Sequence, residues 1–227
     1  MGPIALFKQF KKLTVSTSFD YEIQKISHRK AALYATTTFC EAIYFSTKSQ
    51  LYGYIKKSIL ESSNSTKSHA EFGVFKGQSI NFFANSNPNL QWVGFDCFEG
   101  LPEHWSGNSK LKEHFSTKGN LPKVSQNVKL IKGLFEYTVP KWVETKPEKL
   151  AFVHLDADLY SSTKQVLQSI KELVEGETLF LFDEYFGYVG WEHGEHKAWL
   201  EWLELNQYSA ECIAFAGNGT ALFRLKK

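Results

Sequence analysis

The chain has 227 residues, of which 43% are hydrophobic and 22% charged, a composition that supports a full apolar core and excludes a disordered chain. The formal net charge of +2 and the lack of any Arg/Lys-rich run exclude the strongly basic surface of a nucleic-acid-binding protein. The length fits one α/β domain with a short accessory segment.

The first part of the chain has a helical pattern. Apolar residues recur at helical spacing over about residues 23–60, and the polar stretch at residues 61–68 is typical of a loop. The opening "MGPIALFKQFKKL" is not a secretory signal, because its apolar part is short and precedes the lysines, and no stretch is long enough to span a membrane. We predict an N-terminal helical segment at residues 1–67, able to mediate a homo-oligomer, and one domain at residues 68–227.

The cysteines indicate the compartment. Their number is odd and their spacing is wide: Cys40, Cys97 and Cys212. This pattern favours a reduced, cytoplasmic protein over a disulfide framework, and the chain contains no CxxC pair of the kind that binds zinc.

After residue 68, short apolar runs alternate with helical segments. The runs end near Gly73, Asp96, Gly133, Asp156 and Asp183. Helices are expected to begin near Gln78 and within "SSTKQVLQSIKELV", and this alternation predicts a parallel sheet covered on both faces. The closing "SAECIAFA", "GNG" and "TALFRL" predict two antiparallel strands joined by a tight turn.

Four of the predicted parallel strands finish with an acidic residue: Glu71, Asp96, Asp156 and Asp183. In open α/β sheets, ligands bind outside the carboxyl ends of the strands. Each acid taken alone is compatible with a helix cap or a solvated loop residue. Four acids at equivalent places instead predict a ligand cleft along one edge of the sheet.

The stretch "EFGVFKGQS" follows the first of these strands. Gly73 and Gly77 allow the backbone to approach a ligand closely, and the helix that follows offers free N–H groups at its start. Asp96, at the end of the next strand, is placed to accept hydrogen bonds from a ribose diol. The spacing is not GxGxxG, and the pattern suits NAD as well as any other adenosine-containing cofactor.

The stretches "DAD" and "FDEY" predict a metal site. Asp156, Asp183 and Glu184 are expected to converge from two strand ends, and three carboxylates suit a hard ion such as Mg²⁺, with Mn²⁺ or Ca²⁺ as alternatives. Asp158 remains as a general base, or as a cap of the following helix. His154 lies inside an apolar run and is interpreted as a core histidine rather than a ligand.

The motifs "EFGVFKGQS", "FDCFEGLPE", "HLDADLYSST" and "FDEY" together resemble the class I S-adenosylmethionine-dependent methyltransferases, specifically the macrocin O-methyltransferase (TylF-like) group. The resemblance runs from about Ser68 to the C-terminus. It implies a Rossmann-like, mostly parallel sheet of seven strands that ends in an antiparallel hairpin. It also implies methyl transfer from S-adenosylmethionine, with Mg²⁺, to a hydroxyl of a sugar or of a glycosylated small molecule, so the partner is a small-molecule or glycan acceptor.

The resemblance also implies roles for individual residues. Those that hold the cofactor are Glu71, Gly73, Val74, Gly77, Ser79, Asp96 and Phe135. The implied magnesium ligands are Asp156, Asp183 and Glu184, and the implied general base is Asp158. The family commonly has Asp-Asp-Tyr where this chain has Asp183-Glu184-Tyr185, and the longer stem of glutamate shifts the third donor oxygen.

Three other functions share part of the pattern. An NAD-dependent oxidoreductase would use the glycine turn and Asp96, but it leaves Asp156, Asp183 and the terminal hairpin without a role. A methyltransferase that needs no metal, or that acts on nitrogen, differs only at the acid cluster. A non-catalytic binding protein of the same fold would bind cofactor without metal.

Overall fold

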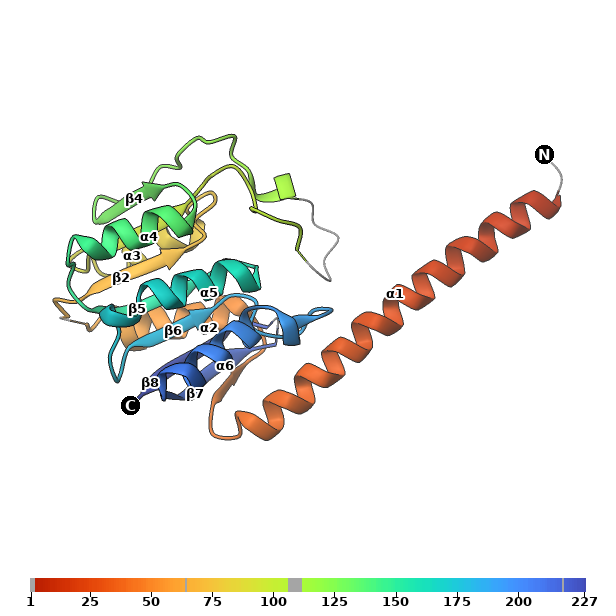
Figure 1. The fold of residues 1–227 in the computed structure, drawn as a ribbon. Helices are drawn as coiled ribbons and strands as arrows, with labels where there is room; N and C mark the ends of the chain where they lie inside the picture. The colour runs from red at the N-terminus through yellow and green to blue at the C-terminus, as the bar shows by residue number, and fades with distance from the viewer. Residues whose placement is uncertain (1–2, 64, 106–111, 218) are drawn as a thin grey trace.

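The computed structural model describes the backbone of residues 3–63, 65–105, 112–217 and 219–227, and the side chains of those ranges from Phe19 onward, Lys112 aside. These residues form an eight-stranded sheet with helices on both faces (Figure 1). The strands are β1 (Ile43–Phe45), β2 (Ser68–Phe72), β3 (Trp92–Asp96), β4 (Val128–Lys132), β5 (Leu150–Leu155), β6 (Leu179–Phe182), β7 (Ser209–Ala216) and β8 (Ala221–Lys226).

The helices follow the predicted alternation with the strands. The α-helices are α1 (Pro3–Thr38), α2 (Lys48–Ile55), α3 (Gln78–Ala84), α4 (Phe135–Glu144), α5 (Tyr160–Ser169) and α6 (Glu195–Asn206). The short helical turns are η1 (Lys56–Leu60), η2 (Lys112–Phe115), η3 (Lys171–Leu173) and η4 (Trp191–His193). The helix expected near Gln78 begins at that residue, and the helix expected in "SSTKQVLQSIKELV" is α5 followed by η3.

The strand order across the sheet is β1-β7-β8-β6-β5-β2-β3-β4. All neighbours are parallel except β8, which is antiparallel to both β6 and β7. The predicted antiparallel pair at the end of the chain is thereby confirmed, although its turn includes Asn218, which lies outside the described residues. The expected count of seven strands is wrong by one, because β1 adds an edge strand that pairs in parallel with β7.

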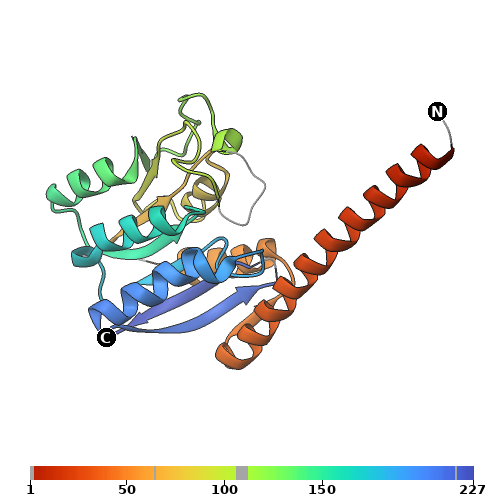
Figure 2. The ribbon, with the colours of Figure 1, turned by 45° about the vertical axis from the view of Figure 1, so that its right-hand side comes forward.

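Two apolar layers hold the helices against the sheet. Helices α4, α5 and α6 cover one face, and α2 and α3 cover the other (Figures 1 and 2). Val139, Val166 and Trp199 belong to the first layer, and Leu51 and Phe83 belong to the second. The buried strands read as continuous apolar runs, such as "LFLF" in β6, because both of their faces are covered.

Helix α1 leaves the sheet and projects away from it (Figures 1 and 2). Among its residues from Phe19 onward, the last turns join the core, where Ala31 and Ala35 are buried together with Phe39 just beyond the helix. Among the described helices, α1 included, none is both long and apolar enough to cross a bilayer.

The segment at residues 1–67 differs from the helical segment that was expected. It contains strand β1, and Leu51 and Ile55 of α2 are fully buried in the core of the sheet. A three-residue edge strand has too few residues to give an alternating pattern, so the sequence did not reveal it. The division of the chain at residue 67 stays a prediction.

The acidic residues lie at the carboxyl edge in the expected register, with one exception. Asp96 is the last residue of β3, and Asp156 and Asp183 directly follow β5 and β6. Glu71 lies one residue inside β2, because that strand continues to Phe72. Successive side chains of a strand point to opposite faces. The Glu71 side chain points to the face that α3 covers, where it accepts a hydrogen bond from Ser79.

Candidate active site

A cavity of about 330 Å³ opens at the carboxyl ends of β2, β3, β4 and β5. Its walls come from the loops that follow these four strands and from the start of α5. Predicted site residues that line it are Gly73, Asp96, Phe135, Asp156 and Asp158. This is the place where open α/β sheets bind ligands.

The turn after β2 brings its backbone against the loop after β5. Gly73 has φ +97°, and a Cβ at this position would lie 1.8 Å from the carbonyl oxygen of Asp156. Only glycine fits here, because any side chain would overlap the neighbouring backbone. The cavity wall and the Asp156 loop are therefore in direct contact at Gly73.

Asp96 fixes this turn through its carboxylate. Oδ2 accepts hydrogen bonds from the backbone N–H groups of Val74 (2.9 Å) and Phe75 (2.7 Å), and Oδ1 accepts one from Phe98 (2.6 Å). Asp96 also lines the cavity, so its predicted contact with a ribose stays open as a prediction. The structure adds a second role, in which Asp96 holds the turn after β2 in shape.

The remaining predicted cofactor residues lie around the cavity in different ways. Phe135 begins α4 and lines the cavity, with its ring edge-on to Phe72 at a centroid distance of 5.9 Å. Gly77 is the N-cap of α3 and has φ +74°. The described residues that line the cavity do not include four of the predicted cofactor residues: Glu71, Val74, Gly77 and Ser79.

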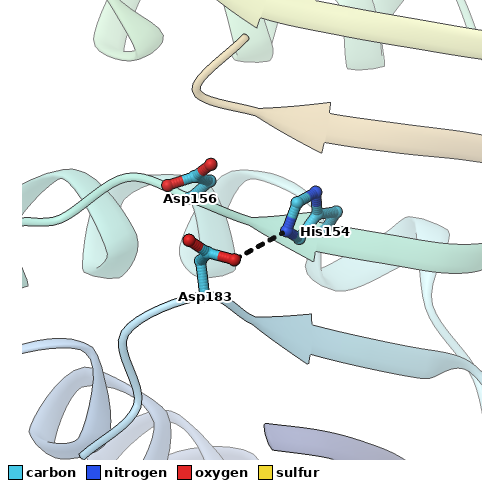
Figure 3. A group of neighbouring side chains, drawn as sticks. All are labelled: His154, Asp156 and Asp183. Carbon is cyan, nitrogen blue, oxygen red and sulfur yellow. Dashed lines mark ion pairs between the residues drawn. The ribbon is translucent and has the colours of Figure 1, made fainter. Parts of the chain in front are cut away.

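Glu71 instead belongs to a row of buried polar side chains on the face of the sheet that α2 and α3 cover. One of its oxygens accepts a hydrogen bond from the Ser79 hydroxyl (2.9 Å), and the other lies 2.8 Å from Nδ1 of His154. The second ring nitrogen of His154 lies 3.3 Å from the Tyr52 hydroxyl and 3.8 Å from Oδ1 of Asp183 (Figure 3). The row thus crosses three neighbouring strands, β2, β5 and β6.

His154 is a charged member of this row. Burial by itself lowers the pKa of its imidazole, but Glu71 and Asp183 outweigh burial and raise the pKa to about 10. Both ring nitrogens have buried partners, Nδ1 with Glu71 and Nε2 with Tyr52 and Asp183. The structure agrees with the interpretation of His154 as a satisfied core histidine.

The carboxylates that follow β5 and β6 lie close together, and two of them, Asp156 and Asp158, line the cavity. Asp156, Asp158 and Glu184 each place an oxygen within 4.8 Å of the others, and Asp156 and Asp183 are grouped in the same way around His154 (Figure 3). Asp156 is therefore common to both groups. Each of the other two predicted metal ligands, Asp183 and Glu184, is grouped with Asp156, and the three as one ligand set stay a prediction.

This clustering changes how readily the acids ionise. Burial raises the pKa of Asp156 well above its usual range, and the charges of Asp183 and Glu184 add to the effect. Burial, followed by the charges of Asp183 and Asp158, raises the pKa of Glu184 in the same direction. Burial also acts to raise the pKa of Asp183, but His154 and Lys48 outweigh it and hold the pKa at about 2.

A divalent cation fits this set of donors. Oε2 of Glu184 is buried and has no hydrogen-bond partner among the described residues. A buried carboxylate oxygen is normally paired, so this oxygen is suited to an ion. All three predicted ligands offer oxygen, the donor that Mg²⁺ prefers, and the +2 charge would relieve the repulsion that raises the pKa values of Asp156 and Glu184.

Asp158 occupies an unusual backbone conformation next to this group. Its φ is +62°, a region that aspartate tolerates better than most residues, and its side chain is 5% exposed. Helix α5 begins at Tyr160 with Leu159 as the N-cap, so Asp158 does not hold the capping position itself. The residue lines the cavity, where a general base would have to be.

The structure adds three polar residues that the sequence did not single out. Lys48 and Tyr52 of α2 each contact one oxygen of Asp183. Glu195, at the start of α6, is fully buried and accepts a hydrogen bond from the backbone N–H of Ala157 (3.3 Å). Burial raises the pKa of Glu195 to about 8. No local pattern marks these residues, because their partners are far away in the sequence.

Comparison with known families bears directly on this site. Residues 70–207, more than half of the chain, match the model of the macrocin O-methyltransferase family, TylF. The chain belongs to the TylF family. It is therefore an S-adenosylmethionine-dependent O-methyltransferase, and the stretch that matches the family includes every predicted site residue from Glu71 to Glu184.

Solved structures show the fold that this TylF-family protein shares. The calicheamicin methyltransferase CalS11 is 21% identical, with a TM-score of 0.59 over 90% of this chain and 91% of that chain. The O-methyltransferase NovP is 18% identical, with a TM-score of 0.59 over 78% of this chain and 80% of that chain. A comparison with curated protein sequences gave no significant match.

Proposed function

We propose that this TylF-family protein is a Mg²⁺-dependent O-methyltransferase that methylates a hydroxyl of a sugar or of a glycosylated small molecule. The observation that carries the proposal is a pair of acid groups that share Asp156, one with Asp183 and the other with Asp158 and Glu184, where Asp156 and Asp158 line the cavity. A metal-independent enzyme would have no need for this buried group of acids, whose mutual repulsion destabilises the fold.

The sugar acceptor is supported by the chemistry of structural relatives. CalS11 is described as a TDP-rhamnose 3'-O-methyltransferase, and its apo form is 20% identical to this chain with a TM-score of 0.53. A sugar hydroxyl ionises with difficulty near neutral pH, so an enzyme that uses one as a nucleophile gains from a Lewis acid and a base side by side. In this site, three carboxylates would hold Mg²⁺ as the Lewis acid, and a fourth carboxylate would serve as the base.

The residues of the cavity have separate roles in this proposal. The turn at Gly73 and Val74, with Asp96 and Phe135, would hold S-adenosylmethionine, which supplies a methyl group activated by a positively charged sulfur. Glu71 and Ser79 support the turn from beneath the sheet through their hydrogen bond. Asp156, Asp183 and Glu184 would hold Mg²⁺, which when bound lowers the pKa of an acceptor hydroxyl and orients it.

Asp158 completes the arrangement as the general base. It lies within reach of Asp156 and Glu184 and lines the same cavity as Gly73 and Asp96. A carboxylate in this position would take the hydroxyl proton while the acceptor oxygen bonds to the methyl carbon and the S–CH₃ bond breaks, so that S-adenosylhomocysteine leaves. The rest of the site contributes by holding both substrates in line, which can supply about 7–11 kcal/mol to a two-substrate reaction.

Ligand binding separates this proposal from the NAD-dependent alternative. We expect S-adenosylhomocysteine to raise the melting temperature of the protein and NAD to leave it unchanged, because ligands stabilise only the state that binds them. Thermal melts with each ligand at equal concentration measure the difference. Stabilisation by NAD alone would contradict the methyltransferase assignment of the cavity.

Replacement of the base tests the mechanism. We expect Asp158→Asn to lower kcat by about 10²–10⁴-fold, because asparagine keeps the shape and tolerates the positive φ but cannot accept the proton. Binding of S-adenosylhomocysteine and Mn²⁺ should remain close to wild type. Methyl transfer followed with labelled cofactor gives kcat, and unchanged turnover would remove Asp158 from the reaction.

We also propose that the protein works in the cytoplasm. Cys40, Cys97 and Cys212 are free thiols, and the thiol of Cys40 is exposed. Exposed free cysteines suit a reducing compartment. A homo-oligomer formed through the N-terminal helices remains a prediction from the sequence.

A further inference from the structure

Helix α2 contacts the acid cluster, although it lies outside the stretch that matches the family model. The Tyr52 hydroxyl donates a hydrogen bond to Oδ1 of Asp183 at 2.8 Å, and the Lys48 ammonium forms a close ion pair with Oδ2. The Asp183 side chain is 5% exposed and the Lys48 side chain 37% exposed. Each oxygen of Asp183 therefore has its own partner on α2.

The two oxygens of Asp183 are not equivalent. Oδ1 faces the buried row, because it accepts from Tyr52 and lies 3.8 Å from Nε2 of His154. Figure 3 shows this oxygen directed at His154 and the other oxygen turned away from it, on the side of Asp156. Oδ2 is thus the oxygen that remains for an ion shared with Asp156, and it is the one that Lys48 holds.

The positive charge of Lys48 also acts on Asp156 and Glu184. The negative charges of Asp183, Asp156 and Glu184 all act on its ammonium group. A lysine side chain in this place partly neutralises the cluster while no ion is bound. This positive charge repels an incoming divalent ion. Binding of the ion also costs the free energy of the ion pair between Lys48 and Asp183.

We propose that Lys48 is an internal cation that competes with the divalent ion for Oδ2 of Asp183, while Tyr52 and His154 keep Oδ1 in position. This inference rests on the proposed metal site. Lys48 is a positioning residue in this scheme, because it acts on the ion through Asp183. Its consequence is that the affinity for the metal is set partly from α2, on the face of the sheet opposite α5 and α6.

The test is direct metal titration of the full-length protein stripped of metal. Binding of Mn²⁺ is measured from the loss of the electron paramagnetic resonance signal of the free ion. We expect Lys48→Met to bind Mn²⁺ about tenfold more tightly than wild type, since the repelling charge is gone. Lys48→Arg keeps the charge and should not show this tightening.

The chain offers a matched control for the loss of charge. Lys56 follows α2, and its side chain is 37% exposed, the same as that of Lys48, but its ion pair is with Glu61 at 4.0 Å. Lys56→Met should leave Mn²⁺ affinity at the wild-type value. If Lys56→Met tightens binding as much as Lys48→Met, a general effect of net charge explains the result and the proposal is wrong.

A second readout is independent of the titration. Without metal, Lys48→Met should melt at a lower temperature than wild type, because Asp183 loses a partner. Saturating Mg²⁺ should narrow or reverse this difference, because the tighter-binding variant gains more from the ion. If Lys48→Met proves too unstable to purify, Lys48→Gln carries the same two expectations.

The outcomes separate this inference from the function it rests on. Wild-type protein that binds no Mn²⁺ overturns the metal site itself, and the role of Lys48 with it. Wild-type protein that binds Mn²⁺ while Lys48→Met binds it equally or more weakly overturns the competition alone. A melting difference that stays constant from zero to saturating Mg²⁺ also contradicts the competition.

Discussion

Replacing Asp156 with alanine is expected to abolish Mn²⁺ and Mg²⁺ binding and to lower kcat/KM for methyl transfer by at least about 10³-fold, since a Lewis acid contributes several kcal/mol to such a step. Asp156 has this weight because it is the carboxylate that both acid groups share. EDTA treatment of the wild-type protein should reproduce the loss, and added Mg²⁺ should restore activity to wild type but not to the variant.

The control for this experiment is another aspartate of the same chain. Asp20 lies on α1, where it is exposed to solvent, and Asp20→Asn should match wild type in both metal binding and turnover. Asp156→Asn serves as the isosteric companion of Asp156→Ala, because it keeps the volume of the side chain and removes only the charge. If EDTA and both Asp156 variants leave turnover intact, the enzyme needs no metal and the acid cluster has another purpose.

The second large effect is expected from Gly73→Ala, which should destabilise the protein and weaken both halves of the site together. A Cβ here lies 1.8 Å from the carbonyl oxygen and 2.7 Å from the carbonyl carbon of Asp156, at a φ of +97°. Backbone strain and overpacking together should lower the free energy of unfolding by about 2–6 kcal/mol. Chemical denaturation measures this loss.

The reason for the coupled loss is geometric. The Asp156 loop must move away from the turn after β2 to make room, and Asp156 belongs to the proposed metal site while Gly73 lines the proposed cofactor cavity. Titrations with S-adenosylhomocysteine and with Mn²⁺ should therefore both weaken. If Gly73→Ala weakens the cofactor alone, the turn and the acid cluster are less tightly coupled than their contact indicates.

Gly53 provides the matched glycine control. It lies within α2, and a Cβ added there has no atom within 4 Å. Gly53→Ala should therefore stabilise the protein slightly, by about 0.5–1 kcal/mol, because alanine favours the helix over glycine. A large loss of stability in Gly53→Ala would mean that the space around α2 is filled in a way the structure does not show.

Much of the candidate site could be predicted because its acidic residues lie at the ends of strands. Asp96, Asp156 and Asp183 each follow or close a buried apolar run, and such runs are visible in sequence as strands. Parallel strands place their carboxyl ends on one edge, so convergence of these acids follows from the element order alone. The family match rests on the same stretches.

The side of the sheet on which a residue lies was harder to infer. Glu71 was expected at the cofactor, but its side chain contacts Ser79 and His154 and does not line the cavity. Neighbouring residues of a strand point to opposite faces, so the position of an acid relative to the strand end decides which face it reaches. Sequence patterns do not locate strand ends accurately enough to decide this.

The sequence by itself determined the α/β architecture, the methyltransferase family and the acids at the strand tips, because each depends on short-range periodicity and on residues a few positions apart. Only the tertiary structure decided that β1 joins the sheet and that Lys48 and Tyr52 hold the two oxygens of Asp183. These contacts join residues more than 130 positions apart, and they form only once α2 packs against the sheet. The packing of distant segments decides which polar groups become partners. Local sequence patterns do not contain this information.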